Sequence, residues 1–297
     1  MSEFALEARG LGKRYGKKWA LRDCTLEIPT GCVAALVGPN GAGKTTLLHL
    51  AVGLTDATAG SVRVLGRSAW EKPEVVLPRL GFVAQEHPLY RRFRIGEMLK
   101  AGEKLNATWD QALAQTRLER LGIPLDQKIG TLSGGQQAQV ALTLALAKRP
   151  ELLVLDEPIA ALDPLARRDF LKSLMEAVAD GGLTVLLSSH IITDLERVCD
   201  YMILLSASQV QLAAPIEDIV AEHRVLSGPR SDPSAVERLH SVIQASHTDR
   251  QTTLVVRANG HLYDSRWQVD EVDLEEIVLA YLGRSPSDAP ESQEVAS

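Results

Sequence analysis

The chain has 297 residues and a mass of 32.3 kDa, which suits one large domain or a large domain with a small appendage. Hydrophobic residues make up 45% and charged residues 24%, a balance that excludes a disordered or fibrous chain. The formal net charge of −6 lacks the basic excess of most nucleic-acid-binding proteins, so we expect no direct nucleic-acid partner.

The sequence contains no obvious export or membrane-spanning segment. The N-terminal segment has no continuous apolar stretch, because it contains the charged residues Glu3, Glu7 and Arg9. No apolar run elsewhere approaches the roughly 20 residues that a bilayer requires. The 3 cysteines are scattered and form no CxxC pair, which favours free thiols in a reducing compartment. We therefore expect a cytoplasmic protein whose only connection with the inner face of the cell membrane is a partner.

The first part of the chain is predicted to contain mainly strands. Apolar residues alternate in the opening segment, and a continuous apolar run between glycines at 32–37 is typical of a strand buried on both faces. The expected elements are strands near 4–8, 19–28, 32–37, 61–65 and 81–84, with one helix from Lys44 to about Gly53.

Helical spacing begins at Ile95 and extends to Leu121, and a further helix is expected from Gly134 to Lys148. Strands at 152–155, 184–188 and 201–205 then alternate with helices at 164–178 and 191–198. This alternation predicts an α/β fold in which crossover helices flank a parallel sheet.

The composition changes after about residue 222. Ser227–Pro233 has the composition of a linker, and a small unit is expected to follow, with a strand at Thr253–Arg257 and a helix at Asp273–Leu282. The last residues, 285–297, are rich in Ser, Pro, Glu and Asp and are predicted to be a disordered tail.

A phosphate-binding loop lies between the strand at 32–37 and the helix that begins at Lys44. The segment satisfies GxxxxGK[ST], the pattern in which backbone N–H groups and a helix N-terminus converge on phosphate oxygens. Lys44 is expected to contact the β- and γ-phosphates, and the Thr45 hydroxyl to bind Mg²⁺. The expected binding residues are Gly38, Pro39, Asn40, Gly41, Ala42, Gly43, Lys44, Thr45 and Thr46.

Two adjacent carboxylates, Asp156 and Glu157, end the apolar strand at 152–155, and Pro158 follows. Because consecutive strand residues point to opposite faces, we expect Asp156 to bind Mg²⁺ and Glu157 to face the attacking water. Hydrolysis requires a proton acceptor close to the γ-phosphate, and Glu157 is the candidate.

A third motif, Leu132-Ser133-Gly134-Gly135-Gln136, precedes a predicted helix. With the other two motifs, it makes the chain resemble the nucleotide-binding subunit of an ABC transporter over roughly Leu6 to Ala213. The resemblance implies a P-loop NTPase-type parallel sheet, an N-terminal antiparallel β subdomain and an α-helical signature subdomain at about 86–150. The ABC ATPase domain would then span 1–222, with a small α+β accessory region at 223–284.

The resemblance also implies roles for single residues. Tyr15 matches the aromatic residue that stacks on adenine, and Asp163 lies in the segment that matches the D-loop. His190 matches the switch histidine. Gln85 matches the glutamine that begins the helical subdomain and reaches the metal. The resemblance thus implies ATP and Mg²⁺ as cofactors. The catalytic set is Lys44, Gln85, Glu157 and His190, and the metal ligands are Thr45, Gln85 and Asp156.

In this family Ser133, Gly134, Gly135 and Gln136 cap the ATP that is bound by the P-loop of a second, head-to-tail subunit. The chain has one copy of each motif, so the resemblance implies a homo- or heterodimer. One departure is Gln139, where the family usually has a basic residue.

Two segments point to the kind of ABC protein. Residues 85–98 resemble the segment that meets a coupling helix of an integral membrane permease subunit, and 272–282 resemble the closing helix of subunits that serve ABC-2 type exporters. An ATP-hydrolysing exporter motor is therefore expected. A soluble ABC-type ATPase with a regulatory, DNA-linked or ribosome-linked role is the alternative.

Overall fold

The computed structural model describes residues 3–230, 233–258, 260 and 266–283. The chain forms two compact units, Met1–Ala213 and Ala214–Ser297. The boundary predicted from the sequence, after residue 222, is later than this one. The second unit begins earlier because α8 (Ile216–Glu222) packs on other elements of that unit, where Ile219 is buried. The predicted tail at 285–297 lies outside the described residues.

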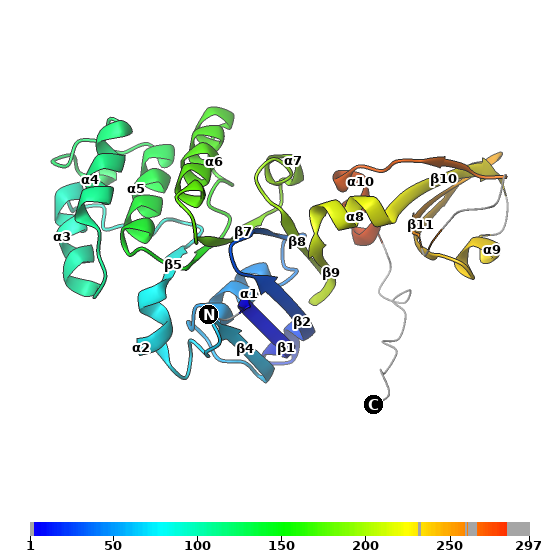
Figure 1. The fold of residues 1–297 in the computed structure, drawn as a ribbon, viewed down its shortest axis with the longest axis horizontal. Helices are drawn as coiled ribbons and strands as arrows, with labels where there is room; N and C mark the ends of the chain where they lie inside the picture. The colour runs from blue at the N-terminus through cyan, green and yellow to red at the C-terminus, as the bar shows by residue number, and fades with distance from the viewer. Residues whose placement is uncertain (1–2, 231–232, 259, 261–265, 284–297) are drawn as a thin grey trace. The chain divides into compact units, whose positions relative to one another are not determined.

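A six-stranded sheet forms the centre of the first unit (Figure 1). Its order is β5-β6-β7-β3-β8-β9, and β5, β6, β7, β3 and β8 pair in parallel. The strands are β5 (Leu80–Val83), β6 (Leu152–Leu155), β7 (Thr184–Ser189), β3 (Val33–Val37), β8 (Tyr201–Ser206) and β9 (Gln209–Pro215). Every residue of β3, β6 and β7 is buried, as expected for strands covered on both faces.

Helices lie between these strands along the chain. They are α1 (Lys44–Ala51), α2 (Pro73–Val76), α6 (Pro164–Ala179) and α7 (Ile192–Leu195). A separate antiparallel sheet, ordered β2-β1-β4, consists of β1 (Phe4–Tyr15), β2 (Lys18–Pro29) and β4 (Ala59–Val64). The fold confirms the predicted P-loop NTPase class and its N-terminal β subdomain.

Three helices pack together beside β5: α3 (Ile95–Leu105), α4 (Gln111–Arg120) and α5 (Gly134–Ala147) (Figure 1). The helical pattern predicted from Ile95 to Leu121 is divided between two helices, because the chain breaks between α3 and α4. There Trp109 lies against Gly102, where a Cβ would overlap the indole ring. Asp110 then caps α4 by accepting a hydrogen bond from the Leu113 N–H at 2.8 Å.

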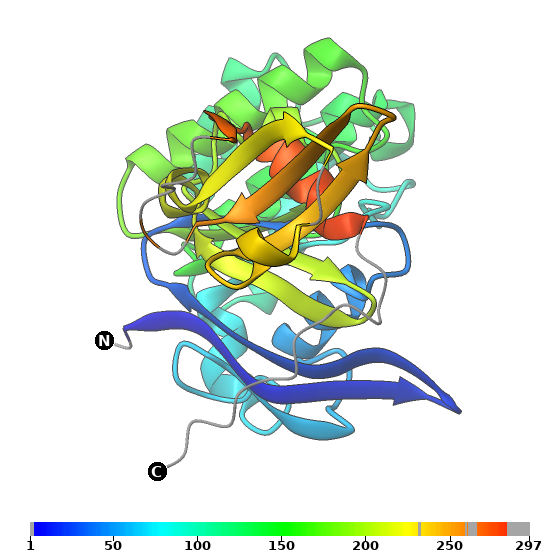
Figure 2. The same ribbon diagram turned by 90° about the vertical axis from the view of Figure 1, so that its right-hand side faces the viewer.

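The second unit is built on a four-stranded sheet, ordered β11-β12-β10-β13, which Figure 2 shows in yellow and orange. Its elements besides α8 are β10 (His223–Pro229), α9 (Ser234–Glu237), β11 (Ser241–His247), β12 (Gln251–Arg257), β13 (Gln268–Asp270) and α10 (Leu274–Leu282). The predicted linker is wrong for residues 227–229, which pair along β12 as part of β10. No helix within the described residues combines the length and apolar composition of a membrane-spanning segment.

A buried histidine joins three elements of this unit. His223 donates from Nδ1 to the Ile219 carbonyl at 2.6 Å, and its Nε2 accepts from the Tyr281 hydroxyl at 3.1 Å. Burial lowers the pKa of His223, and the hydrogen bond to Ile219 opposes that shift. Burial in the folded second unit therefore disfavours the charged form of this imidazole.

We expect the stability of the second unit to fall as the pH drops below the ordinary histidine pKa of about 6.5. Below that value the unfolded chain binds a proton that folded His223 resists, so acid favours unfolding. Thermal unfolding of the full chain between about pH 5 and pH 8 measures this loss. The His223→Asn variant should lose less stability over the same range. An equal loss in both proteins would contradict the prediction.

Candidate functional site

The loop between β3 and α1 is a backbone cradle that requires glycine at two close approaches. A Cβ at Gly38 would overlap the Leu205 carbonyl oxygen, and one at Gly43 would overlap the Ala20 carbonyl oxygen. Gly43 also has a φ of 111°, which favours glycine, and it is the N-cap of α1. The free N–H groups of that helix start therefore face the loop.

Beside the cradle lies a pocket of about 550 Å³, here called the P-loop pocket. Its lining includes most of the residues predicted to bind a nucleotide: Tyr15, Asn40, Gly41, Gly43, Lys44, Thr45, Thr46, Gln85 and Glu157. Lys18 and Ala20, which the sequence analysis did not predict, complete the lining. The remaining loop residues, Gly38, Pro39 and Ala42, lie beneath this lining, where Gly38 and Pro39 contact Lys44 and Ala42 is buried.

Lys44 lies at the centre of the pocket and is almost fully buried. Its ammonium group donates to the carbonyl oxygens of Gly38 and Pro39, at 2.7 and 3.3 Å, and forms an ion pair with Glu157 at 3.2 Å. The Lys44 and Glu157 side chains are each 7% exposed. A buried lysine paired with one movable carboxylate can exchange that partner for another anion, such as a phosphate.

Asp156 and Thr45 bring two oxygen ligands together. Their Oδ1 and Oγ1 atoms are 3.3 Å apart, and Asp156 Oδ1 also accepts a hydrogen bond from the Ser188 hydroxyl at 2.9 Å. Ser188 in turn accepts the Glu157 backbone N–H at 2.8 Å. Sequence reasoning missed Ser188, although it lies near the carboxyl end of β7, the strand next to β6.

Strand alternation does not set the directions of the two adjacent carboxylates, although the sequence argument relied on it. Strand β6 ends at Leu155, and Glu157 has a left-handed φ of 46°, so strand alternation no longer applies. Glu157 instead turns toward Lys44 and toward His190, whose Nδ1 lies 2.7 Å from Glu157 Oε2. His190 follows β7 directly and its side chain is 49% exposed, so the carboxylate joins a buried lysine to a solvent-facing histidine.

Tyr15 lies at the open end of the pocket with 54% of its surface exposed. The Lys13 ammonium lies 5.4 Å from the centre of the Tyr15 ring. Lys13 also donates to the Asp56 carboxylate at 2.9 Å, and this hydrogen bond lowers the pKa of Asp56. An exposed aromatic ring held beside the phosphate cradle is suited to stacking on a planar base.

The remaining predicted residues do not line this pocket. Ser133 is the exposed N-cap of α5 and accepts the Gln136 N–H at 3.2 Å, while the Gln136 side chain accepts the Ser133 N–H at 3.0 Å. Asp163 caps α6, accepting the N–H groups of Leu165 and Ala166 at 3.0 Å each. The two helix starts are close together, since a Cβ at Gly135 would lie 3.0 Å from the Ala166 methyl.

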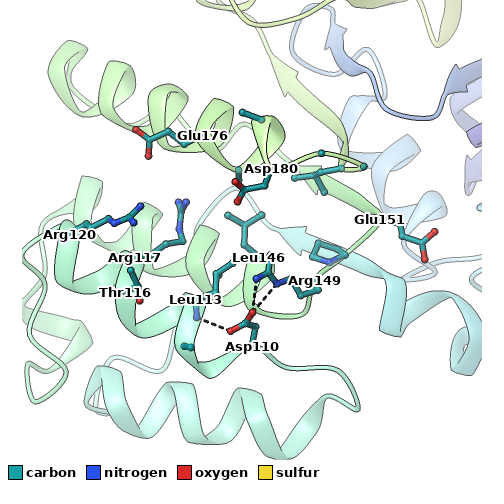
Figure 3. A pocket seen from close by; sticks show the side chains of 17 residues that line it. Asp110, Leu113, Thr116, Arg117, Arg120, Leu146, Arg149, Glu151, Glu176 and Asp180 are labelled. Atoms are coloured by element: carbon teal, nitrogen blue, oxygen red, sulfur yellow. Dashed lines mark hydrogen bonds and ion pairs between the residues drawn. The ribbon is translucent and has the colours of Figure 1, made fainter.

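A larger cavity of about 880 Å³ lies between α4 and α6 and contains none of the predicted residues. Figure 3 shows Arg117 and Arg120 projecting from α4 toward Glu176 of α6 and toward Asp180, which follows that helix. Arg117 donates to the Ser173 carbonyl at 3.3 Å, and burial lowers the pKa of its guanidinium. Gly181 and Gly182 line this cavity, but no residue of the phosphate-binding motif does, so it does not replace the P-loop pocket as the candidate site.

Comparisons with known proteins agree with this geometry. Residues 21–160 match the family model of the ABC transporter. The lantibiotic transport ATP-binding protein SrtF of Streptococcus pyogenes is 31% identical over 66% of this chain and 85% of its own length. The Nod factor export ATP-binding protein I of Rhizobium johnstonii is 33% identical over 70% of this chain and 68% of its own.

Solved structures give the same assignment. An ATP-binding subunit of an ABC transporter superposes with a TM-score of 0.66 at 29% identity, covering 73% of this chain and 92% of that one. The glycine cradle, the buried lysine and the paired carboxylates thus occur in a chain whose relatives are named as ATP-binding proteins of transporters. The protein belongs to the ABC transporter family as one of its ATP-binding, ATP-hydrolysing subunits.

Proposed function

We propose that the chain is the motor subunit of an ABC exporter, acting as a head-to-tail dimer on a separate membrane subunit. The main support for the proposal is that the groups expected to bind ATP lie at two separate places on the chain. Lys44, Glu157 and Gln85 line one pocket, whereas Ser133 lies at an exposed helix start outside it. A second chain would supply the missing groups.

The contacts in the P-loop pocket support specific roles. ATP would replace Glu157 as the partner of Lys44, because the phosphates bring more negative charge than one carboxylate. Glu157, released from Lys44 and still held by His190, would accept the proton of the attacking water. His190 would keep that carboxylate oriented.

The oxygen ligands near Lys44 fit Mg²⁺. A hydroxyl, a carboxylate and an amide oxygen, from Thr45, Asp156 and Gln85, are hard ligands of the kind that this ion prefers. Magnesium would neutralise phosphate charge there. Ser188 would hold Asp156 oriented through its 2.9 Å hydrogen bond.

The start of α5 supports a role toward a second chain. The Ser133 oxygen accepts the Gln136 N–H in its own helix, so its own O–H group remains able to donate outward. Exposed glycine N–H groups at the same helix start would complement a γ-phosphate of the partner chain. Asp163 would lie in the same dimer interface.

The membrane partner would meet the segment that follows Gln85. Tyr90 and Phe93 stack on each other there with ring centres 5.2 Å apart, and they are 67% and 38% exposed. Binding through this surface would hold the chain at the inner face of the membrane. The export direction rests on the resemblance of 272–282 to exporter subunits and on the Nod factor export relative. Another relative is named for hypophosphite import, so import is the alternative direction that an experiment has to exclude.

Tyr15→Ala is expected to weaken ATP binding about tenfold, because stacking on a base is worth about 1–3 kcal/mol. Tyr15→Trp should preserve the affinity, since its indole offers a similar ring face. Equilibrium binding of a fluorescent ATP analogue measures both variants. Equal affinities for the wild type and Tyr15→Ala would exclude the contact.

The dependence of ATPase activity on protein concentration tests the proposed dimer. If two chains form each site, the rate per chain should rise with concentration and then reach a plateau, and EDTA should abolish it. A rate per chain that stays constant down to nanomolar protein would contradict the proposal. Transport by membrane vesicles that contain the chain and its permease would then establish the direction.

A further inference from the structure

The hairpin formed by β1 and β2 has two faces with different contacts. Tyr15 pairs with Lys18 across the turn, and Arg14 pairs with Trp19. The Arg14 guanidinium lies 5.5 Å from the centre of the Trp19 ring, so these two side chains share one face. Because residues alternate between faces along a strand and cross-strand partners share a face, Tyr15 and Lys18 belong to the other one. That face borders the P-loop pocket, whose lining includes both residues.

The strand that begins with Lys18 contacts the phosphate cradle two residues later. Ala20 also lines the pocket, and it lies so close to the loop that a Cβ at Gly43 would overlap its carbonyl oxygen. Lys18 thus lies on the short backbone segment that joins the turn beside Tyr15 to the cradle.

The lysines near Tyr15 and the cradle differ in what their ammonium groups contact. Lys44 is paired with Glu157, and Lys13 is paired with Asp56. Lys18 is exposed, and its ammonium forms no ion pair or hydrogen bond with a residue that the structure describes. An unpaired cation on a flexible stem at the edge of a nucleotide site is able to reach an anionic group of the ligand.

We propose that the Lys18 ammonium contacts the α-phosphate of bound ATP. The inference rests on the proposed ATP site, in which Tyr15 stacks on the base and Lys44 contacts the β- and γ-phosphates. The order of the groups along ATP places the ribose and the α-phosphate between these two contacts. Since Lys18 is the cross-strand neighbour of Tyr15, the α-phosphate is the anionic group nearest to it. ADP carries the same group, so the contact adds affinity for both nucleotides.

Isothermal titration calorimetry of the full chain with ATP and with ADP tests the contact. Lys18→Ala should weaken both nucleotides by the same factor, about threefold to fivefold, the upper part of the range for an exposed ion pair. This loss should shrink as the salt concentration rises, because ions screen exposed charges. Lys18→Arg keeps the charge and should stay within about twofold of the wild type. Adenosine lacks phosphate, so as a competitor of ADP it should bind equally well to Lys18→Ala and the wild type.

Lys17→Ala is the matched control, because Lys17 is the exposed neighbour in the hairpin turn and is not among the residues that line the pocket. It should bind ATP as tightly as the wild type. An equal loss in Lys17→Ala and Lys18→Ala would overturn the inference, as would a loss for ATP without one for ADP. Unchanged affinity in Lys18→Ala beside a loss in Lys44→Ala would also overturn it. Unchanged affinity in Lys44→Ala would instead overturn the P-loop pocket as the site of ATP binding.

Discussion

Glu157→Gln is expected to bind ATP as tightly as the wild type, or more tightly, and to lose about 10²–10⁴-fold in turnover. The loss follows from removing the proton acceptor beside the cradle, since a glutamine amide does not accept the proton of water. Binding should survive because the same substitution frees Lys44 from its 3.2 Å ion pair with Glu157. Phosphate release and nucleotide binding by the purified variant measure the two effects separately.

A matched control is available at the opposite end of β6. Glu151 precedes β6, and its carboxylate pairs with Arg79 far along the strand from the pocket, so Glu151→Gln should keep wild-type turnover. Near-wild-type activity in Glu157→Gln would contradict the assignment. A loss of ATP binding in Glu157→Gln would show that the substitution weakens the complex with ATP and not only the transition state for hydrolysis.

Ser133→Arg is expected to abolish ATP hydrolysis while leaving ATP binding by the single chain intact. Ser133 does not line the P-loop pocket, so the substitution should not reach the nucleotide held by its own chain. In the proposed dimer, a bulky side chain at this helix start would fill the space that the partner's γ-phosphate must enter. Steady-state ATPase activity and equilibrium ATP binding measure the two effects.

Ala112→Arg provides the control for the added charge, because Ala112 is an exposed residue on α4 of the same helical subdomain. It should retain wild-type activity. If Ser133→Arg also retained it, the start of α5 would have no part in hydrolysis. If Ser133→Arg lost ATP binding, the effect would be on the fold of its own chain.

Local patterns predicted the centre of the first unit well. The apolar run at 32–37 and the run before Asp156 correspond to β3 and β6. A strand that is buried on both faces needs an apolar residue at nearly every position, so it is easily recognised in the sequence. The break between α3 and α4 left a weaker signal. It depends on Trp109 packing against Gly102, a contact between residues whose helical spacing alone suggested continuity. The pairing of residues 227–229 with β12 is likewise a long-range contact, which a linker-like composition concealed.

The site was predicted to the extent that its chemistry lies in sequence motifs. The motifs correctly placed Lys44, Thr45 and Glu157 in one pocket. Each motif is a short segment, a glycine-rich turn or the end of a strand, that can be recognised from neighbouring residues alone. Ser188 was missed, since it contacts the Glu157 backbone from a distant part of the chain. The reason given for the orientation of Glu157 was wrong, because Glu157 lies beyond the end of β6 with a left-handed φ, which has no local signature at a residue other than glycine.

The molecular mass of Glu157→Gln protein in the presence of ATP and Mg²⁺ tests the account most directly. Static light scattering should give about twice 32.3 kDa, because ATP that is not hydrolysed keeps two head-to-tail chains closed. The Glu157→Gln, Ser133→Arg double variant should bind ATP and keep the mass of one chain. A single-chain mass for Glu157→Gln at saturating ATP, or an equal dimer fraction in the two proteins, would contradict the composite site.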